Sequence, residues 1–450
     1  MLEIGEQIPS QTLTAKEHKM APSLRSLAML SGLLVSRALA QTPSPPSGQG
    51  LHSLIVAAGK LFFGTAIEVN NFNDSAYMAI ARNRAEFGMY VPENSQKWEE
   101  IQPTAGRFDF ADPDSIVNLA KENGMMFRCH TLTWHSQLPT FVANGTWTRE
   151  TLSAVITTHI TNVMTHYRGL CYAWDVVNEA LNDNGTFRNS VFLRTLGTDY
   201  IPLSFAAAAA ADPNTKLYYN DFNLETSPPK ADGAIRIVRL IQAANVPIHG
   251  IGFQSHFRVG QTPNRTALVN LQNRFVALGL ETSFTELDIA QLSLPANASA
   301  LERQAQDYVG VVGACLDVPR CVGITLWQFT DKYSWIPSTF PGLGDACLWT
   351  ANFTKKPAYS SVVSLLQAAA PTSPPASSSG NAGPRPFGLG TNVNGNGAAD
   401  ATAGGVVAAT GTASSGSGDN AGLTVASAAS ALMRGWCILL SVAAGVVFVL

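Results

Sequence analysis

Two segments of the sequence each carry a glutamate at or near the end of an apolar run. Residues 174–179 read WDVVNE, and residues 284–289 read FTELDI. Two carboxyl groups that flank a glycosidic bond can cleave it, because one donates a proton to the leaving oxygen while the other, ionised, attacks the anomeric carbon. The two groups need environments that push their pKa values apart. We predict that Glu179 and Glu286 form such a catalytic pair.

Three further residues could support this pair. Asn178 precedes Glu179 and could form a hydrogen bond with a sugar 2-hydroxyl. His256 could hold Glu286 in its ionised form and orientation, and Asp288 could in turn fix the imidazole. A single glutamate is most often a surface or salt-bridged carboxylate. The prediction therefore depends on the whole set and not on either glutamate alone.

Other side chains are suited to sugar binding. Indole rings offer flat faces that stack on pyranose rings, and the candidates are Trp134, Trp327 and Trp335. A second set could form hydrogen bonds with hydroxyl groups and comprises Glu93, Asn94, Lys97, His130 and Gln254. The alternative is that the tryptophans, and His130 with them, are core residues. No H-E-x-x-H or G-x-S-x-G motif occurs in the region predicted to fold, and we predict neither a metal site nor a cofactor.

The candidates accompany short runs rich in Val, Ile, Phe and Tyr, which alternate with amphipathic stretches. The runs predict eight strands, at 62–68, 88–93, 125–134, 172–179, 216–222, 249–256, 283–289 and 323–329. Helical patterns between them include 114–123, 151–167, 203–211, 229–244 and 298–316. Eight strands with eight crossovers predict an α/β fold, the (β/α)₈ TIM barrel.

Two observations favour a barrel over an open, doubly wound sheet. The open sheet would normally carry a glycine-rich phosphate-binding loop after an early strand, and the sequence has none. The polar and aromatic candidates also gather at the carboxyl ends of the predicted strands, where such barrels build their active sites. Glu179 and Glu286 belong to the fourth and seventh predicted strands, which face each other across a barrel, so their side chains can converge.

The beginning of the chain predicts export. Residues 1–40 are interpreted as a signal peptide, with translation starting at Met20, because Arg25, an apolar stretch and an A-L-A ending follow that residue. Residues 41–50 form a linker, and residues 51–367 are assigned to the barrel.

The end of the chain predicts a lipid anchor. Residues 368–435 are dominated by Ser, Gly and Ala, a composition typical of a disordered stalk, here with an anchor spacer. The apolar run 436–450 is shorter than the about 20 residues of a membrane span. This layout matches a glycosylphosphatidylinositol signal, with Asn420 as the candidate attachment residue. A short hydrophobic tail that stays attached is the alternative.

Cysteines and glycosylation sequons agree with an extracellular destination. Cys315 and Cys321 flank a short loop with a proline, which predicts a local disulfide. Cys129 and Cys171 lie on strands predicted to be neighbours, where a second disulfide and two buried thiols are both open. Cys347 has no obvious mate. Six sequons predict N-glycosylation, at Asn73, Asn144, Asn184, Asn264, Asn297 and Asn352.

The composition excludes some partners. Apolar residues make up 46% of the chain and charged residues 14%, with a formal net charge of -3. Nucleic-acid binding would require a basic patch, and no such stretch is present. A neutral substrate is compatible with this charge, and we expect a monomer.

Several motifs resemble those of glycoside hydrolase family 10, the endo-β-1,4-xylanases. They are PENSQKW at 92–98, HTLTWHSQLP at 130–139, WDVVNEA at 174–180, QSH at 254–256, TELDI at 285–289, LW at 326–327, DKYSW at 331–335 and KPAY at 356–359. The resemblance covers about 51–366. It implies double displacement with retention at xylan, with Glu179 as acid/base and Glu286 as nucleophile. It also implies that one set lines the glycone side of the cleft: Glu93, Asn94, Lys97, His130, Trp134, Asn178, Gln254, His256, Trp327 and Trp335.

Two residues depart from the family pattern, Gln328 and the unpaired Cys347. Gln328 stands where the family usually has glycine after the tryptophan, which predicts a different local shape beside Trp327 but the same chemistry. Two other functions stay open: a related barrel glycanase acting on cellulose or mannan, and a non-catalytic, wall-anchored carbohydrate-binding protein on a degenerate barrel. Degenerate barrels usually lose a catalytic carboxylate, whereas both are present here.

Overall fold

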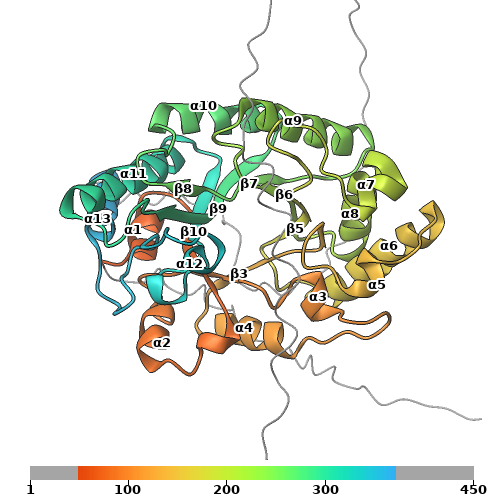
Figure 1. Ribbon diagram of the computed structural model, residues 1–450, viewed down its shortest axis with the longest axis horizontal. Coiled ribbons are helices and arrows are strands. Elements are labelled where there is room, and N and C mark those ends of the chain that lie inside the picture. Colours follow the sequence, from red (N-terminus) through yellow and green to blue (C-terminus); the bar gives the residue numbers. More distant parts are fainter. Residues whose placement is uncertain (1–48, 371–450) are drawn as a thin grey trace, which may run out of the picture. The chain divides into compact units, whose positions relative to one another are not determined.

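The computed structural model describes residues 49–370. The predicted signal peptide, nearly all of the linker and stalk, the apolar tail and Asn420 lie outside this range. Within it, eight parallel strands form a closed ring in the order β10-β1-β2-β3-β5-β6-β7-β9, and β9 pairs with β10 (Figure 1). The strands of the ring are β1 (Phe62–Ile67), β2 (Met89–Pro92), β3 (Met126–Cys129), β5 (Ala173–Asn178), β6 (Lys216–Asp221), β7 (Gly250–Phe253), β9 (Glu281–Ala290) and β10 (Cys321–Leu326). The predicted (β/α)₈ barrel is confirmed.

Two predicted strands are each divided in the structure. The run 125–134 becomes β3 and the short β4 (Thr133–Trp134), which pairs with β5. The run 249–256 becomes β7 and β8 (His256–Arg258), which pairs with β9. Ser255 has a φ of 64°, and such a left-handed residue cannot continue an extended strand. The prediction that His256 ends the sixth strand is therefore wrong, although only two residues separate β8 from that strand.

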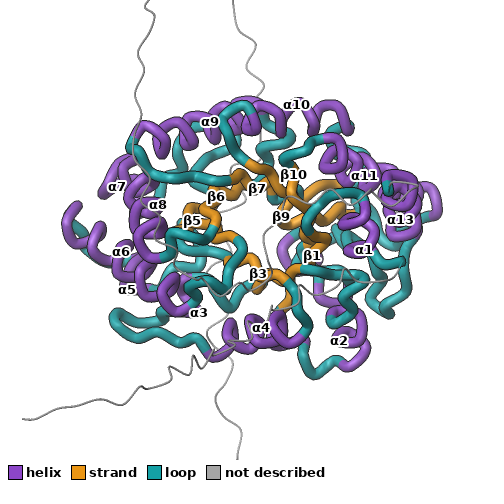
Figure 2. The backbone as a smooth tube through the Cα atoms, turned by 180° about the vertical axis from the view of Figure 1, so that it is seen from behind, coloured by secondary structure: helices purple, strands orange, loops and turns teal. Residues whose placement is uncertain are grey.

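Helices surround the ring of strands (Figure 2). The helices are α1 (Leu51–Ala57), α2 (Ser75–Ala81), α3 (Trp98–Ile101), α4 (Ala111–Glu122), α5 (Thr140–Ala143), α6 (Arg149–His166), α7 (Val191–Leu196), α8 (Tyr200–Ala211), α9 (Pro228–Ala243), α10 (Arg265–Val276), α11 (Ala298–Asp317), α12 (Ile336–Thr339) and α13 (Pro357–Ala369), with 3₁₀ turns η1 (Val69–Asn71), η2 (Gly197–Asp199) and η3 (Asp331–Tyr333). Side chains cap several of them: Ser227 accepts a hydrogen bond from Lys230 N at the start of α9, and Pro228 occupies the first turn.

The barrel strands are buried along almost their whole length. All ten residues of β9 and all six of β1 and β5 are buried. Parallel strands in such a barrel are covered by helices outside and by packed side chains inside. The sequences of these strands are therefore nearly continuous apolar runs, and a charged or polar residue within one is a candidate for a functional role.

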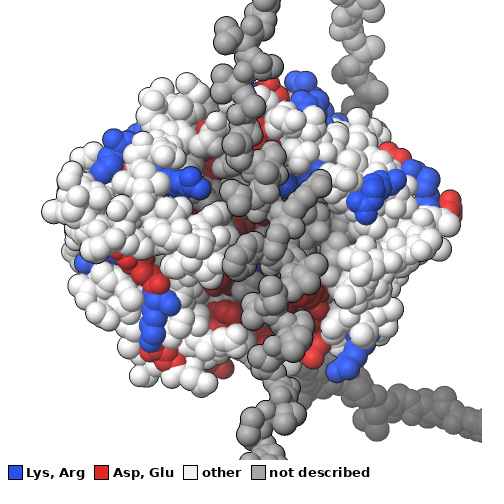
Figure 3. Space-filling model, viewed as in Figure 1, with Lys and Arg blue, Asp and Glu red and all other residues white. Residues whose placement is uncertain are grey.

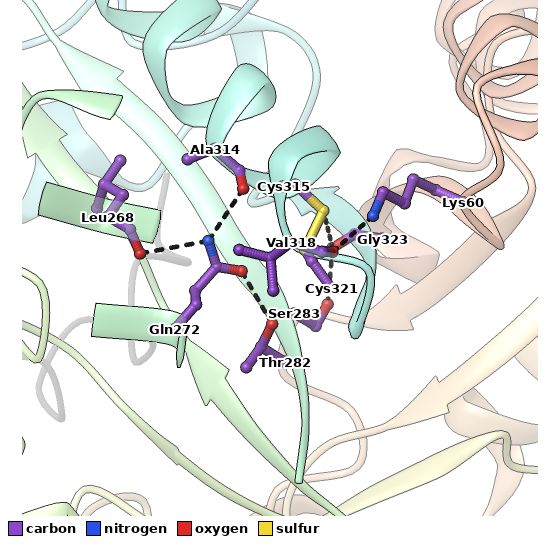
Figure 4. Close-up of a disulfide and its surroundings, with 10 residues drawn as sticks. All are labelled: Lys60, Leu268, Gln272, Thr282, Ser283, Ala314, Cys315, Val318, Cys321 and Gly323. Atoms are coloured by element: carbon purple, nitrogen blue, oxygen red, sulfur yellow. Dashed lines mark hydrogen bonds between the residues drawn. A yellow bond between two sulfur atoms is a disulfide. The ribbon is translucent and has the colours of Figure 1, made fainter. Parts of the chain in front are cut away.

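The predicted Cys315–Cys321 disulfide is present, and of the two alternatives left open for Cys129 and Cys171 the structure has the disulfide. Cys315 and Cys321 join the end of α11 to the start of β10, and Lys60 Nζ donates to Val318 O in the loop between them, 2.7 Å away (Figure 4). The second disulfide joins Cys129 at the end of β3 to Cys171, just before β5. Cys347 is buried and has no disulfide partner within residues 49–370.

The surface is lightly charged. On the face in Figure 3, Lys and Arg side chains are scattered and do not gather in one patch. None of the helices in residues 49–370 combines the length and apolar character that crossing a bilayer requires.

Glu86 joins the two ends of the described chain. This buried carboxylate accepts hydrogen bonds from Leu51 N in α1 (3.2 Å), from Lys355 Nζ (2.8 Å) and from Tyr359 Oη in α13 (2.9 Å). Because α1 precedes the first strand and α13 follows the last, this one side chain ties both segments to the loop before β2.

Replacement of Glu86 by alanine should therefore destabilise the whole barrel. Loss of several bonds to one charged group predicts a fall of about 2–3 kcal/mol in the free energy of unfolding, or roughly 5 °C in Tm for a domain of this size. Thermal unfolding followed by circular dichroism measures it. Glu122→Ala, at the exposed end of α4, is the control and should stay within about 0.5 kcal/mol. Equal Tm values for the two variants would contradict the role given to Glu86.

Candidate active site

Glu179 stands directly after β5 in an unusual backbone conformation. Its φ is 54°, a left-handed value that is uncommon for a residue with a side chain. The backbone is held on both sides, since Glu179 N donates to Asn220 O (2.9 Å) and Arg188 Nε donates to Glu179 O (3.0 Å). The partly exposed side chain is thus supported by a fixed main chain.

Glu286 lies within β9 and is only 5% exposed. Its Oε1 accepts a hydrogen bond from Asn220 Nδ2 (2.8 Å), and its Oε2 lies 3.2 Å from His256 Nε2. Burial alone would raise the pKa of Glu286, but the bond from His256, with the other donors and cationic groups nearby, holds it below its ordinary value. This carboxyl group is therefore kept ionised.

His256 connects Glu286 to a second buried carboxylate. Its Nδ1 lies 3.0 Å from Oδ2 of Asp288, which is fully buried, and Trp335 Nε1 donates to the same oxygen (2.8 Å). Burial would lower the pKa of His256, yet Asp288 and Glu286 outweigh it and raise the pKa to about 10. The imidazole is then a cation at neutral pH, in the place that the sequence predicted for a support of Glu286.

A chain of amides joins the two glutamates. Asn220 Nδ2 donates both to Glu286 Oε1 and to Asn178 Oδ1 (3.0 Å), and Asn178 Nδ2 donates to Glu179 Oε1 (3.3 Å). Gln254 Nε2 donates to the same Glu179 oxygen (3.0 Å). The residues predicted on the fourth, sixth and seventh strands therefore meet in one network.

Gly252 makes room for the central amide. A Cβ at this position of β7 would lie 2.1 Å from Asn220 Oδ1, which no side chain can tolerate. That oxygen instead accepts a hydrogen bond from Thr285 Oγ1 (2.7 Å), the neighbour of Glu286. Asn220 is thereby locked between two strands.

The residues predicted after β2 form a second group. Lys97 Nζ donates to Asn94 Oδ1 (2.8 Å) and lies 5.1 Å from the centre of the Trp134 ring. Glu68 Oε2 accepts the backbone N–H of Asn94 (2.8 Å) and so fixes the turn. Burial lowers the pKa of Lys97 and raises the pKa of the adjacent Glu93 to about 7.

His130 is oriented by a buried ion pair inside the barrel. Its Nδ1 lies 3.0 Å from Asp175 Oδ2, and Arg128 Nε donates to that oxygen (3.2 Å). Burial would raise the pKa of Asp175, but Arg128 and His130 hold it low. His130 is thus buried with a satisfied ring nitrogen, and its ring edge faces Trp327 at 5.4 Å.

Two predicted tryptophans stand beside this network. Trp327 follows β10 and packs on Ala66 and Val91, with Trp335 against the same cluster. Gln328 follows with a φ of 73° and a fully buried side chain. The left-handed backbone explains why glycine is usual at this position.

Sequence reasoning gave no site role to Asp175, Arg128 or Asn220. Asn220 carried a signal, as a polar residue at the end of an apolar run. Arg128 and Asp175 carried a weaker one, because each is a charge in the middle of such a run. Asp175 lies 45 positions after His130 and 47 positions after Arg128 in the chain, so only the folded barrel reveals these contacts.

The arrangement suits acid–base and nucleophilic chemistry at one bond. The cationic His256 keeps Glu286 ionised, whereas the Glu179 side chain bonds only to neutral amides among the described residues. A family model described as glycosyl hydrolase family 10 matches residues 50–365. The chain belongs to this family. It is therefore a glycoside hydrolase, as the motifs predicted.

Named relatives agree with the family. Over 348 residues the chain is 57% identical to endo-1,4-beta-xylanase 5 of Pyricularia oryzae, which covers 77% of this chain and 86% of the relative. It is 55% identical to endo-1,4-beta-xylanase 1 of Humicola insolens, over 71% of this chain and 75% of the relative. A family 10 xylanase structure from a Bispora species, solved with xylobiose, has a TM-score of 0.68 and 38% identity, and the match covers 70% of this chain and 99% of that one.

The pH dependence of hydrolysis should depend on His256. The pKa of Glu286 is lowered in the folded enzyme, so this carboxylate stays ionised until the pH falls below the ordinary carboxyl range. His256→Asn removes the cation and should raise that pKa by about one unit or more. The acid limb of kcat/KM on a chromogenic aryl β-glycoside should then move to higher pH by the same amount.

His166→Asn is the matched control, since this histidine lies on the outer helix α6 and pairs with Asp114. Its pH profile should equal that of the unmodified enzyme. An unchanged acid limb in His256→Asn would contradict the ion pair as the cause of the low pKa.

Proposed function

We propose that this enzyme is a retaining endo-1,4-β-xylanase, which hydrolyses internal β-1,4-xylosidic bonds of xylan by double displacement. The observation that carries the proposal is the unequal environment of two carboxyl groups joined by one amide chain. Glu286 is buried beside a cationic imidazole, whereas Glu179 is partly exposed and bonded to amides. This is the division that an ionised nucleophile and a proton donor require.

In the first step Glu286 attacks the anomeric carbon while Glu179 gives its proton to the leaving oxygen. The product is a covalent glycosyl ester on Glu286. In the second step Glu179, now ionised, takes a proton from water, which attacks the same carbon and releases Glu286. Asn178 is the proposed donor or acceptor for the sugar 2-hydroxyl, and Asn220 keeps it next to both glutamates.

Proposed sugar-binding groups surround this pair. They are Glu93, Asn94, Lys97, His130, Trp134, Gln254, His256, Trp327 and Trp335. Their carboxylate, ammonium and amide groups alternate with indole faces, which suits a neutral sugar chain better than a charged ligand. All belong to loops or short strands at the carboxyl ends of the barrel strands, where (β/α)₈ enzymes bind substrate.

Two alternatives are less well supported. The names of the relatives and the xylobiose complex favour xylan over cellulose or mannan. A non-catalytic binding protein would have no need for the pairing of His256 with both Glu286 and Asp288, which lowers the pKa of one carboxylate.

We further propose that the enzyme is secreted as a monomeric glycoprotein and held at the cell membrane or wall by a glycosylphosphatidylinositol anchor. Two disulfides in the barrel support passage through an oxidising compartment. The asparagines of all six sequons are exposed: Asn73, Asn144, Asn184, Asn264, Asn297 and Asn352. The signal peptide, the stalk and the attachment at Asn420 rest on sequence alone.

Loss of either glutamate should abolish xylan hydrolysis, but added azide should distinguish their roles. Glu179→Ala still forms the ester from a substrate with a good leaving group, and azide should replace water to give a β-glycosyl azide. Glu286→Ala forms no ester, so azide should attack directly and give the α-azide. We expect kcat on xylan to fall by at least about 10³-fold in both variants, and nuclear magnetic resonance of the azides assigns the anomers.

Glu302→Ala, on the exposed face of α11, is the control and should keep full activity. A β-azide from Glu286→Ala would reverse the two roles. Full xylanase activity in both site variants would overturn the assignment of the pair.

The anchor predicts a specific release experiment. Cells that express the full chain should retain xylanase activity on their surface, and phosphoinositide-specific lipase should release it. A chain truncated after residue 370 should appear in the medium without lipase. Surface activity that resists the lipase but dissolves in detergent would favour the alternative, a hydrophobic tail that stays attached.

A further inference from the structure

Gln328 occupies a position that its own backbone disfavours. A φ of 73° is accessible to glycine without steric cost, but a residue with a Cβ is strained there. The side chain is nevertheless fully buried between the end of β10 and its neighbours. A strained residue kept at an active-site mouth points to a contribution from its side chain.

The amide of Gln328 makes two hydrogen bonds, one as acceptor and one as donor. Its Oε1 accepts from Tyr77 Oη on α2 (3.2 Å), and its Nε2 donates to Glu93 Oε2 (3.0 Å). Tyr77 is itself held by stacking on Phe329, with ring centres 4.7 Å apart. A rigid aromatic ring therefore orients the amide, and the amide orients the carboxylate.

Glu93 has one engaged oxygen and one that is free. Oε2 bonds to Gln328, whereas Oε1 has no hydrogen-bond partner among residues 49–370. The carboxylate is half-buried, so this second oxygen is available to a ligand. By holding one oxygen, Gln328 fixes the orientation of the carboxylate and leaves the other oxygen free.

We propose that Gln328 is a positioning residue, which holds the Glu93 carboxylate in the orientation that accepts a sugar hydroxyl on the glycone side. The inference rests on the proposed xylanase function and extends it to a residue that does not touch the substrate. A glycine at position 328 would fit the backbone better but would leave Glu93 without this donor.

The charged surroundings of Glu93 make its pKa sensitive to this one bond. Burial raises its pKa to about 7; the bond from Gln328 and the cationic Lys97 oppose that rise, and the carboxylates of Glu68 and Asp288 add to it. Removal of the Gln328 donor should raise the pKa of Glu93 further. The ionised carboxylate, which can only accept hydrogen bonds, is then protonated at a higher pH than in the unmodified enzyme.

The first test is Gln328→Gly with a xylo-oligosaccharide as substrate. This variant relieves the backbone strain but removes a buried side chain and the acceptor of the Tyr77 hydroxyl, so its Tm is measured beside its kinetics and the assay is run well below that Tm. KM should rise roughly tenfold, the order expected for one lost bond to a charged group, while kcat stays within about twofold. A KM equal to that of the unmodified enzyme would overturn the proposal.

The second test keeps the shape of the side chain and makes its ability to donate a hydrogen bond depend on pH. In Gln328→Glu the introduced carboxyl can donate to Glu93 only when it is protonated. KM should therefore stay near the original value at acidic pH and rise more than tenfold as both groups ionise. A residue that only fills space would give a KM shift independent of pH, and that result would contradict the positioning role.

Tyr77→Phe and Tyr333→Phe form a matched pair of controls. Both rings belong to one aromatic cluster, with centres 5.2 Å apart, but only the Tyr77 hydroxyl reaches Gln328. Tyr77→Phe should raise KM severalfold, and Tyr333→Phe should not; equal effects would count against the relay. An unmodified enzyme that fails to hydrolyse xylo-oligosaccharides would refute the proposed function, whereas an active enzyme with silent Gln328 variants would refute this inference alone.

Discussion

The parallel register of β5, β6 and β7 is the constraint on which the site depends. Asn178 pairs with Asn220, and Asn220 pairs with Gly252. A slip of one residue would turn every side chain of a strand to its other face and would move Asn220 away from Glu286. Barrel closure fixes this register, because each strand is held by two neighbours and the ring has no free edge. Hydrogen bonds between neighbouring barrel strands therefore determine which side chains meet in the active site.

The sequence allowed the fold and most of the site to be predicted because both follow from local patterns. Apolar runs revealed the strands, and polar residues at their ends, such as Glu179 and Gln254, pointed to one face. What could not be predicted depends on contacts across the ring. The pairing of Asp175 with Arg128 is one example, and the separation of His256 onto β8 is another, since a left-handed Ser255 leaves no compositional mark.

The difference in environment that keeps Glu286 ionised depends on groups buried beneath the active site. Asp288 is fully buried and would be costly without partners, but it lies beside His256 and accepts the Trp335 indole N–H. The negative charge of Asp288 keeps the imidazole protonated, and the protonated imidazole keeps Glu286 ionised. Each charge is therefore stable only because the next one is present, which explains why the three groups lie on adjoining strands β8 and β9.

Three residues with left-handed backbones stand just beyond strand ends beside the site. Glu179, Ser255 and Gln328 have left-handed φ values; Glu179 directly follows β5, and the other two are the second residues after β7 and β10. Each strained residue is held by partners: Tyr219 Oη accepts the N–H after Glu179, Ser255 Oγ donates to Glu225, and Gln328 bonds to Tyr77. Left-handed backbones also occur elsewhere in the described chain, for example at Asn245 and Phe353, but at these three positions the surrounding contacts fix the backbone beside the site.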